Sequence, residues 1–308
     1  ATAGLTVVVH ADGTVSVSDG ESALNNVSHI SRIVGGEGND QFFIERNSTN
    51  HPFLDGGPDG SDTLDYSDFT TDLAIDLSNP SVHPTGTSGV LHIENIIGGS
   101  GDDTLIAGDG DAILNGGLGD DHLIGGAGAD GLIGGEGVDI LEGGGGDDIL
   151  DGGPDGDELY GYFKNATGVD TGSDTASYYS FQIDEDGSGL TVDLANDPTD
   201  PYESTEDALG DTFSGIENIT GSMGSDVLVG NAGTNIIAGM DGNDVLIGMG
   251  GDDVMDGGIG WDMVSYADYD TGAIDATGGV HVELEGNESD HPYEVVGTDK
   301  TLADVASG

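Results

Sequence analysis

Large apolar residues recur at every ninth position along two stretches of the chain. Leu occupies seven such positions in a row between residues 98 and 160, and Leu, Ile, Met or Val occupies five between residues 221 and 265. Each of these residues predicts one very short strand with a single core side chain. The predicted core residues are Leu105, Leu114, Leu123, Leu132, Leu141, Leu150, Leu159, Leu228, Ile237, Leu246, Met255 and Val264.

The other positions of each nine-residue repeat also follow a pattern. The template is Gly-Gly-x-Gly-x-Asp-x-U-x, where U is the apolar residue and the glycines allow a tight turn with positive φ angles. One copy lies at residues 35–43, one with an extra residue at 56–65, seven at 98–160 and five at 221–265. This spacing is the signature of a calcium-loaded parallel β-helix. The predicted fold is therefore all-β, with parallel β-roll blocks joined by short β-rich linking segments.

The segments between the blocks repeat as well. Residues 73–77, 190–194 and 280–284 alternate apolar and polar side chains, which predicts half-buried strands. Ile-Glu-Asn-Ile precedes the second and third blocks, at residues 93–96 and 216–219. The chain begins at one linking strand and stops where another lead-in is due, so we expect a fragment of a longer array.

These blocks and segments predict five parts. Residues 1–97 hold a strand, a short block and a linking segment, and residues 98–173 form the main block. Residues 174–220 hold a strand and a lead-in, residues 221–265 form the second long block, and residues 266–308 form a terminal linking strand.

Two nonapeptides make one coil, so acids at the same position of every second repeat stack on one side of the coil. Their separation is then about 4.8 Å, the ordinary distance between strands. Carboxylates that close repel each other unless a cation lies between them. Calcium fits because it takes about six to eight oxygen ligands, including carbonyls that a glycine turn can aim inward. Magnesium requires octahedral geometry and keeps its waters, and zinc prefers His or Cys, which the turns lack.

This register predicts the calcium-binding residues. Ala112 and Asn235 stand where the pattern requires Asp, so we expect a missing or weakened ion beside Ala112 and one carbonyl ligand from Asn235. The predicted acids are Asp40 and Asp62 in the first block; Asp103, Asp121, Asp139 and Asp157 on one side of the main block, with Asp130 and Asp148 on the other; and Asp226, Asp244 and Asp262 in the last block, with Asp253 opposite. The predicted turn glycines are Gly117, Gly119, Gly126, Gly128, Gly135, Gly137, Gly144, Gly146, Gly242 and Gly251.

One large side chain per nine residues is a thin core. Burying a Leu contributes roughly 1.5–3 kcal/mol, whereas ordering nine residues costs on the order of 9–18 kcal/mol of backbone entropy. Ion binding must therefore supply much of the difference, and we expect folding and metal binding to be a single event.

Composition narrows the partners. Asp and Glu total 60 against 4 Lys and Arg, which gives a formal net charge of −56. Such a chain should repel nucleic acid and anionic lipid and attract cations. It has no Cys, which excludes a disulfide scaffold. No run of about 18 apolar residues predicts a membrane span, and we expect no secretory signal at the start of the sequence.

The nonapeptides resemble those of the repeats-in-toxin (RTX) family, the hemolysin-type calcium-binding repeat proteins that bacteria secrete through type I systems. The resemblance covers about 130 residues directly. It implies a parallel β-roll, several bound Ca²⁺ ions, and export of an unfolded chain that folds in external calcium. It also implies an extracellular or cell-surface location.

Three functions are compatible with these features. The first is a calcium-binding structural or adhesive module of a secreted or surface protein, which folds on calcium after export. The second is a non-catalytic accessory segment of a large extracellular enzyme, such as a lipase, protease, epimerase or peroxidase. The third is a carbohydrate- or ice-binding module. No catalytic motif of the common hydrolase or phosphate-binding types occurs, so we expect no enzyme activity. Self-association and a cell-surface glycan are further partners to test.

Overall fold

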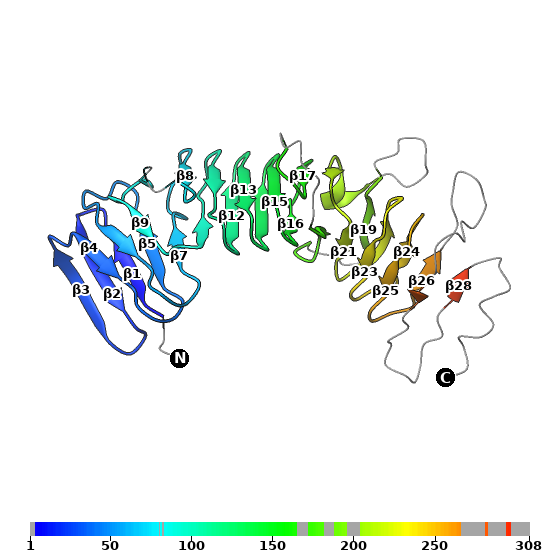
Figure 1. Ribbon diagram of the computed structural model, residues 1–308, viewed down its shortest axis with the longest axis horizontal. Helices are drawn as coiled ribbons and strands as arrows, with labels where there is room; N and C mark the ends of the chain where they lie inside the picture. The colour runs from blue at the N-terminus through cyan, green and yellow to red at the C-terminus, as the bar shows by residue number, and fades with distance from the viewer. Residues whose placement is uncertain are drawn as a thin grey trace. The chain divides into compact units, whose positions relative to one another are not determined.

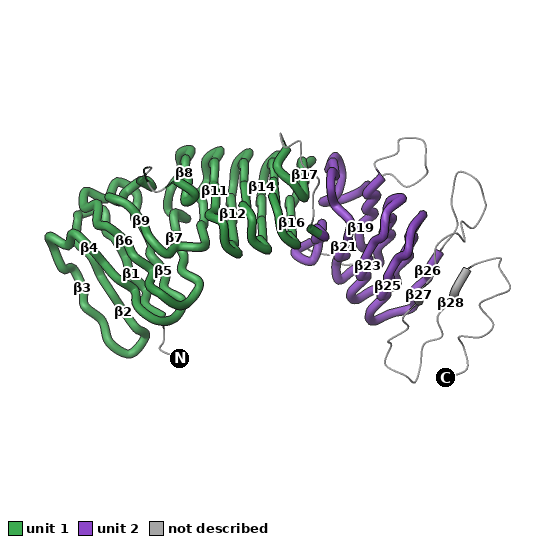
Figure 2. The backbone as a smooth tube through the Cα atoms, in the orientation of Figure 1, with its two compact units in different colours: residues 1–172 green, residues 173–308 purple. Residues whose placement is uncertain are grey.

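The computed structural model describes residues 4–79, 81, 83–164, 172–181, 188–195 and 204–265, and the backbone of 281–282 and 294–296. The chain forms two compact units, residues 1–172 and 173–308, coloured separately in Figure 2. The regular structure of the described residues is β-strand, apart from the short 3₁₀ helix η1 (Glu206–Ala208). The all-β prediction is confirmed, and the division into five parts stays a prediction.

Unit 1 is built from rows of short strands (Figure 1). Neighbours are parallel except for the pairs β1–β2 and β2–β3. The first row runs β16 (Ile149–Asp151), β14 (Gly131–Glu136), β12 (Ile113–Leu118), β10 (Asn95–Ile97), β7 (Thr63–Asp65), β5 (Gln41–Ile44), β1 (Thr6–Val9), β2 (Thr14–Ser18) and β3 (Ala23–Ser28). The second runs β17 (Glu158–Tyr160), β15 (Ile140–Gly144), β13 (His122–Gly126), β11 (Thr104–Ile106) and β8 (Ala74–Asp76), and the third β4 (Arg32–Val34), β6 (Phe53–Asp55) and β9 (Val90–Leu91).

The strand register shows the predicted coil of two nonapeptides. Leu105 is paired with Leu123, and Leu123 with Leu141, along one row. Leu114 and Leu132 are aligned in the same way along the other row. Successive nonapeptides therefore alternate between two sheets, and every second repeat lies directly against the one before it. The parallel β-roll is confirmed.

The linking strands continue these rows. β8, in the predicted strand at residues 73–77, pairs in parallel with β11 at the start of the main block. β1 pairs in parallel with β5 in the same way. Each linking strand thus serves as the first coil of a block, although it lacks the glycine turn.

Unit 2 repeats this architecture. One row runs β27 (His281–Val282), β25 (Val254–Asp256), β23 (Ile236–Ala238), β21 (Asn218–Thr220) and β18 (Thr175–Ser177). The other runs β19 (Ser188–Asp193), β22 (Ser225–Val229), β24 (Val245–Ile247), β26 (Met263–Ser265) and β28 (Glu294–Val296), and β20 (Thr212–Ser214) follows η1. β19 lies in the predicted linking strand and pairs with β22 at the start of the last block.

The predicted core residues all lie between the sheets. Each is buried, and the most exposed, Val264, is only 5% exposed. Two tyrosines that follow a block are also buried: Tyr66 donates from its hydroxyl to the Thr85 carbonyl at 2.7 Å, and Tyr178 donates to Asp211 Oδ2 at 2.6 Å. These side chains close the apolar interior where the chain leaves the roll.

Candidate metal sites

Buried aspartates form a hydrogen-bonded column along unit 1. We call it the inner ladder of the main block, and its members are Asp103, Asp121, Asp139 and Asp157. The backbone N–H of each of the first three donates to Oδ1 of the next member, at 2.6–2.7 Å. None of the four residues is more than 2% exposed. Because the coils stack in register, the same position of every second repeat falls on this column.

The other predicted acids form equivalent inner ladders. On the opposite side of the main block, Ala112 N–H donates to Asp130 Oδ1 and Asp130 N–H to Asp148 Oδ1, both at 2.8 Å. The remaining pairs are Asp40 to Asp62 at 2.7 Å, Asp226 to Asp244 at 2.9 Å, Asp244 to Asp262 at 3.0 Å, and Asn235 to Asp253 at 3.0 Å. The structure thus brings the predicted side chains into the expected columns. That they bind calcium stays a prediction.

Three of these inner ladders start at a leucine of a linking strand. The N–H of Leu5 donates to Asp40 Oδ1 at 2.5 Å, that of Leu73 to Asp103 Oδ1 at 2.8 Å, and that of Leu190 to Asp226 Oδ1 at 2.8 Å. The linking strand therefore provides the backbone N–H that a preceding coil of the roll would provide, but it adds no carboxylate to the ladder.

Several ladder acids have one carboxylate oxygen without a donor. In the part of the chain that the structure describes, Oδ2 is buried and has no hydrogen-bond partner in Asp40, Asp121, Asp130, Asp139 and Asp244. In Asp103, by contrast, Oδ2 accepts the Gly99 N–H at 2.9 Å, and in Asp226 it accepts the Ser222 N–H at 2.8 Å. A buried carboxylate oxygen without a donor is costly, so the acids of the first group are the ones that need a cation.

Burial raises the pKa of these carboxyl groups. The pKa of Asp121 rises to about 7 because the group is desolvated, and the charges on Asp139 and Asp103 add to the effect. The pKa of Asp244 also rises to about 7, and that of Asp130 and Asp139 to about 6, again mainly through burial. The charged form is therefore unfavourable without a counter-ion, and a divalent cation at the ladder would remove that cost.

Glycine is required at several positions of the turn that precedes each of these carboxylates. A Cβ built on Gly116 would collide with Asp121 Oδ2 and with the carbonyl oxygen of Gly134 in the next coil. The glycines at the second and fourth positions of the turn, such as Gly117 and Gly119, have φ near +115° (113° and 117°), a region that side chains disfavour. The other predicted turn glycines with positive φ are Gly126, Gly135, Gly137, Gly144, Gly146, Gly242 and Gly251. Gly128 does not share this φ, but a Cβ there would collide with the backbone of Gly110 and Asp111.

This arrangement fits calcium. The space that a Cβ would fill on each first-position glycine is bordered by a side-chain oxygen of the ladder, and in several coils this oxygen has no donor. In most coils a carbonyl oxygen of the next coil borders the same space. Hard oxygens of these two kinds are the ligands that calcium prefers. In the described residues, no three His, Cys, Asp or Glu side chains gather at one point. Turn carbonyls would therefore have to complete any coordination shell.

Two glutamates of the inner ladders, Glu94 and Glu217, were missed in the sequence. Glu94 Oε2 accepts the Asp62 N–H at 2.9 Å, and Glu217 Oε2 accepts the Asp174 N–H at 3.0 Å. Both belong to the Ile-Glu-Asn-Ile lead-ins, which return the chain to the roll after an insert. Counting two repeats back from Ala112 and Asn235 reaches these two glutamates, so the coil period could have identified them.

The asparagine after each glutamate joins three coils. The side-chain Nδ2 of Asn95 donates to Ser61 Oγ at 2.8 Å, and its side-chain Oδ1 accepts the Ile113 N–H at 2.9 Å. Asn218 makes the same contacts, with Ser173 Oγ at 3.0 Å and the Ile236 N–H at 2.9 Å. The coil is thus closed by neutral hydrogen bonds at the two places where an insert interrupts the repeats.

The two departures from the Asp pattern lie one coil beyond these lead-ins. Ala112 has no side-chain oxygen, and a weak or missing ion beside it stays a prediction. In Asn235, Nδ2 donates to the Glu217 carbonyl at 2.5 Å and Oδ1 accepts the Asn231 N–H at 2.9 Å. A carbonyl ligand from Asn235 stays a prediction.

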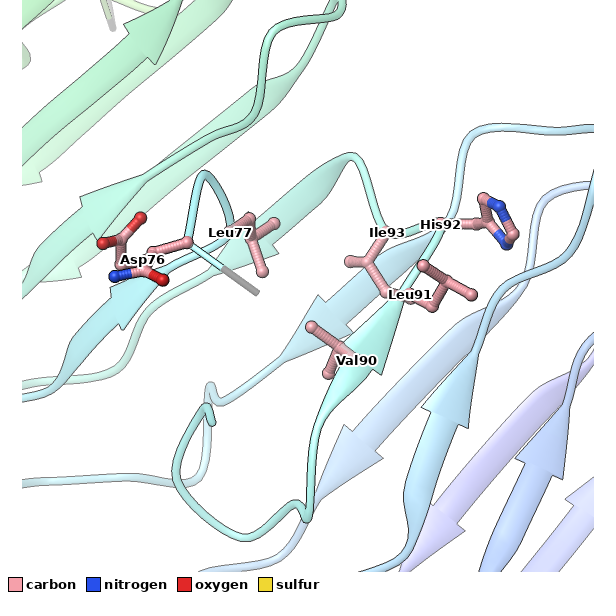
Figure 3. Close-up of a pocket in the computed structure, with 7 residues that line it drawn as sticks. Asp76, Leu77, Val90, Leu91, His92 and Ile93 are labelled. Carbon is pink, nitrogen blue, oxygen red and sulfur yellow. The ribbon is translucent and has the colours of Figure 1, made fainter. Parts of the chain in front are cut away.

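A small hollow lies apart from the ladders, beside β8 and β9. Its volume is about 120 Å³, and Leu77, Val90 and Ile93 line it together with Asp76 and His92. In Figure 3 the Asp76 and His92 side chains lie at opposite ends of the group and do not converge. Catalytic acid–base pairs need convergent polar groups, so we assign no reaction to this hollow.

Comparison with known proteins finds a family model that matches the nonapeptide blocks. The family model for the RTX calcium-binding nonapeptide repeat (four copies) matches residues 89–123, 97–132, 108–141, 133–162, 211–246 and 229–264. No curated protein matches the chain significantly. No helix among the described residues is long and apolar enough to span a membrane.

Proposed function

Residues 89–162 and 211–264 are RTX calcium-binding nonapeptide repeats, and from this we propose that the chain is an extracellular module that folds when it binds calcium. The repeats form a calcium-binding β-roll. The proposal adds that calcium is required for the fold, that the chain acts outside the cell, and that it serves a structural or adhesive role there.

One observation carries the proposal: several buried ladder acids have one carboxylate oxygen without a donor. Asp121, Asp139 and Asp244 place a carboxylate oxygen in the interior without a partner among the described residues, and burial raises their pKa values. A net charge of −56 adds general repulsion. A stack that is unfavourable without cations and matches calcium's oxygen preference is suited to respond to the high calcium outside a cell.

The described site residues support a non-catalytic role. Most of the buried aspartates stand in ladders, where we propose that calcium occupies them. The one hollow described above has no convergent polar groups. We therefore propose that any reaction of a larger protein containing this chain would take place elsewhere.

A calcium titration of the full chain tests this function. Far-UV circular dichroism and small-angle X-ray scattering should show an expanded chain in chelator and a compact β-rich one in calcium. We expect a midpoint at about 10⁻⁴–10⁻³ M, the range of extracellular calcium modules. Magnesium at the same concentrations is the control and should not replace calcium. A fully ordered β spectrum in metal-free buffer, or an equal response to magnesium, would refute the proposal.

A further inference from the structure

A second column of hydrogen bonds runs along the outside of the turns, beside the inner ladders. Its acceptors are the side chains of the residues immediately before the inner-ladder positions. Acids occupy those positions in most coils, Ala112 or Leu73 in two, and the repeat template leaves the preceding position open. Val138 N–H donates to Asp120 Oδ1 at 3.0 Å, and Asp120 N–H donates to Asp102 Oδ1 at 3.1 Å. These residues are exposed. We call this column the outer ladder.

The outer ladder runs in the opposite direction to the inner one. Asp103 N–H donates forward, to Asp121 of the next coil, whereas Asp120 N–H donates back, to Asp102 of the coil before. Stacked turns of this kind are therefore bridged both ways, once by a buried carboxylate and once by an exposed side chain. Two oppositely directed bonds fix the register of neighbouring coils better than one.

Every acceptor side chain offers an oxygen atom, but not every acceptor is charged. Asn243 N–H donates to the Ser225 hydroxyl oxygen at 3.0 Å, and Trp261 N–H donates to Asn243 Oδ1 at 2.8 Å, so neutral side chains serve in unit 2. In unit 1 the further pairs are Ala129 to Asp111 at 3.0 Å, Asp102 to Asp72 at 3.2 Å and Ser61 to Asn39 at 3.1 Å.

The outer ladder also survives where the repeat is interrupted. Ser61 and its acceptor Asn39 are 22 residues apart, and Asp102 and Asp72 are 30 apart, instead of the usual 18. The bonds therefore follow the stacking of the turns and not the spacing of the sequence. Val138, Ala129 and Trp261 donate to the column but carry no acceptor oxygen at this position, so the column ends at each of them.

We propose that the residue before each ladder acid is a positioning residue: its acceptor oxygen sets the register of the next turn, and it is not a calcium ligand. The inference deepens the proposed function, because calcium would bind between turns that this column aligns. Asp, Asn and Ser should be interchangeable at the position, whereas a side chain without an acceptor should loosen the turn that follows.

Amide hydrogen exchange of the full chain in calcium, followed by NMR, tests the role of Asp120. Asp120→Ala should speed exchange of the Val138 amide about fivefold, the factor that corresponds to one hydrogen bond of ordinary net strength. Asp120→Asn should leave that amide unchanged, because the amide oxygen replaces the carboxylate oxygen. Val138→Ala is the matched control at the end of the column and should not disturb the Asp120 amide.

A second pair of variants, at Asn243 in unit 2, tests the opposite change in charge. Asn243→Ala should speed exchange of the Trp261 amide, whereas Asn243→Asp, which adds a charge but keeps the acceptor, should not. If Asp120→Ala fails to fold, this pair of variants still tests the inference. Trp261 is the single tryptophan, so its fluorescence can report the calcium midpoint of the last block, which should rise in Asn243→Ala alone.

The outcomes separate this inference from the proposed function. Equal exchange in Asp120→Asn and Asp120→Ala would show that charge or ion contact matters, and would overturn the inference. Unchanged exchange in both alanine variants would overturn it as well. A wild-type chain that ignores calcium would instead overturn the proposed function, while the comparison of amides could still be made on the folded chain.

Discussion

Residues 4–97 bury Phe42, Ile44 and Tyr66 among other aromatic and branched side chains, whereas each coil of residues 98–160 buries little besides two leucines. The first region also carries charge pairs. Arg32 and His92 both contact Asp55, at 2.5 Å and 2.9 Å. In the second region the buried charges are mainly stacked aspartates, and Glu142, which pairs with His122 Nε2 at 2.7 Å, is the exception among its buried acids. Both regions share the coil geometry of unit 1, yet the first has a larger core of its own and the second depends more on an added cation.

This difference shows that the coil period does not by itself determine what stabilises a roll. The antiparallel hairpin of β2 and β3 extends the first region beyond the repeat, and the ladder there has few acids. Where the sequence departs most from the nonapeptide, the hydrophobic core is largest. We therefore expect the calcium requirement to increase from residues 4–97 to residues 98–160.

The largest expected effect is that of calcium removal. In chelator, the amides of β11 to β17 should lose their protection from hydrogen exchange, while those of β1, β5 and β7 keep much more of theirs. The reason is that apolar burial persists when the ions leave, but the inner ladder of the main block is left with unbalanced charge. Exchange measured by mass spectrometry on peptides from the two regions gives the comparison. Equal loss in both would mean that the larger core does not stabilise the first region independently.

A pair of core substitutions sharpens the contrast. Leu132→Ala and Leu54→Ala each remove a fully buried side chain and should each cost about 2–5 kcal/mol. Leu132→Ala should raise the calcium concentration needed to fold the main block, because ion binding must offset the loss. Leu54→Ala should instead reduce the structure that survives in chelator. Calcium titrations and chelator spectra of both variants measure this, and an identical pattern in the two would contradict the proposed division.

Position within a ladder should matter next. Asp139→Ala should weaken calcium-dependent folding more than Asp226→Ala, because Asp139 Oδ2 has no donor among the described residues whereas both oxygens of Asp226 accept hydrogen bonds. The difference should be about 1.5–3 kcal/mol, the range for losing one interaction made by a charged group. Calcium midpoints from circular dichroism provide the measurement. Matching midpoints would argue that the two acids bind ions equally.

The smallest effect should be that of pH on the metal-free chain. Burial raises the pKa of Asp121 to about 7 and that of Asp139 to about 6, so the folded main block binds protons more tightly than the unfolded chain. The folded, metal-free main block should therefore become more stable as pH falls from about 7 towards about 4, the ordinary pKa of Asp. This gain in stability should be lost again as pH rises.

The first region should respond less to the same change. Burial tends to raise the pKa of Asp55, but hydrogen bonds from His92 and Arg32 lower it overall, which opposes the raised pKa of Asp62. Hydrogen exchange in chelator from pH 8 to pH 5, read on peptides by mass spectrometry and corrected for the intrinsic effect of pH on exchange, should show protection of residues 98–160 before any change in residues 4–97. In calcium the trend should reverse, because protons compete with the ion.

Much of the roll and of the inner ladders could be predicted from the sequence. The ninth-position leucines predicted the buried residues, and the coil of two repeats predicted which aspartates share a column, as the bonds from Asp103 to Asp157 confirm. These predictions succeeded because a strict repeat leaves one register in which every apolar side chain points inward.

The inserts defeated the same reasoning. Glu94 and Glu217 lack the glycine turn, so the nonapeptide template does not reach them, although both hold the same place in the Ile-Glu-Asn-Ile lead-ins. They enter the ladders only because the chain leaves the roll after Tyr66 and Tyr178 and returns in register. The hairpin of β2 and β3 was not predicted either, because residues 14–28 carry no repeat that marks their partners.

The sequence alone determined the repeat, the one-in-nine core, the acid columns and the excess of negative charge, because these depend on composition and spacing along the chain. Only the tertiary structure decided which carboxylate oxygens lack a donor, which way each hydrogen bond points and how the coil closes across an insert. Those properties arise between coils, where residues about 18 to 43 positions apart face each other, and a donor's direction depends on how the coils stack rather than on neighbours in sequence.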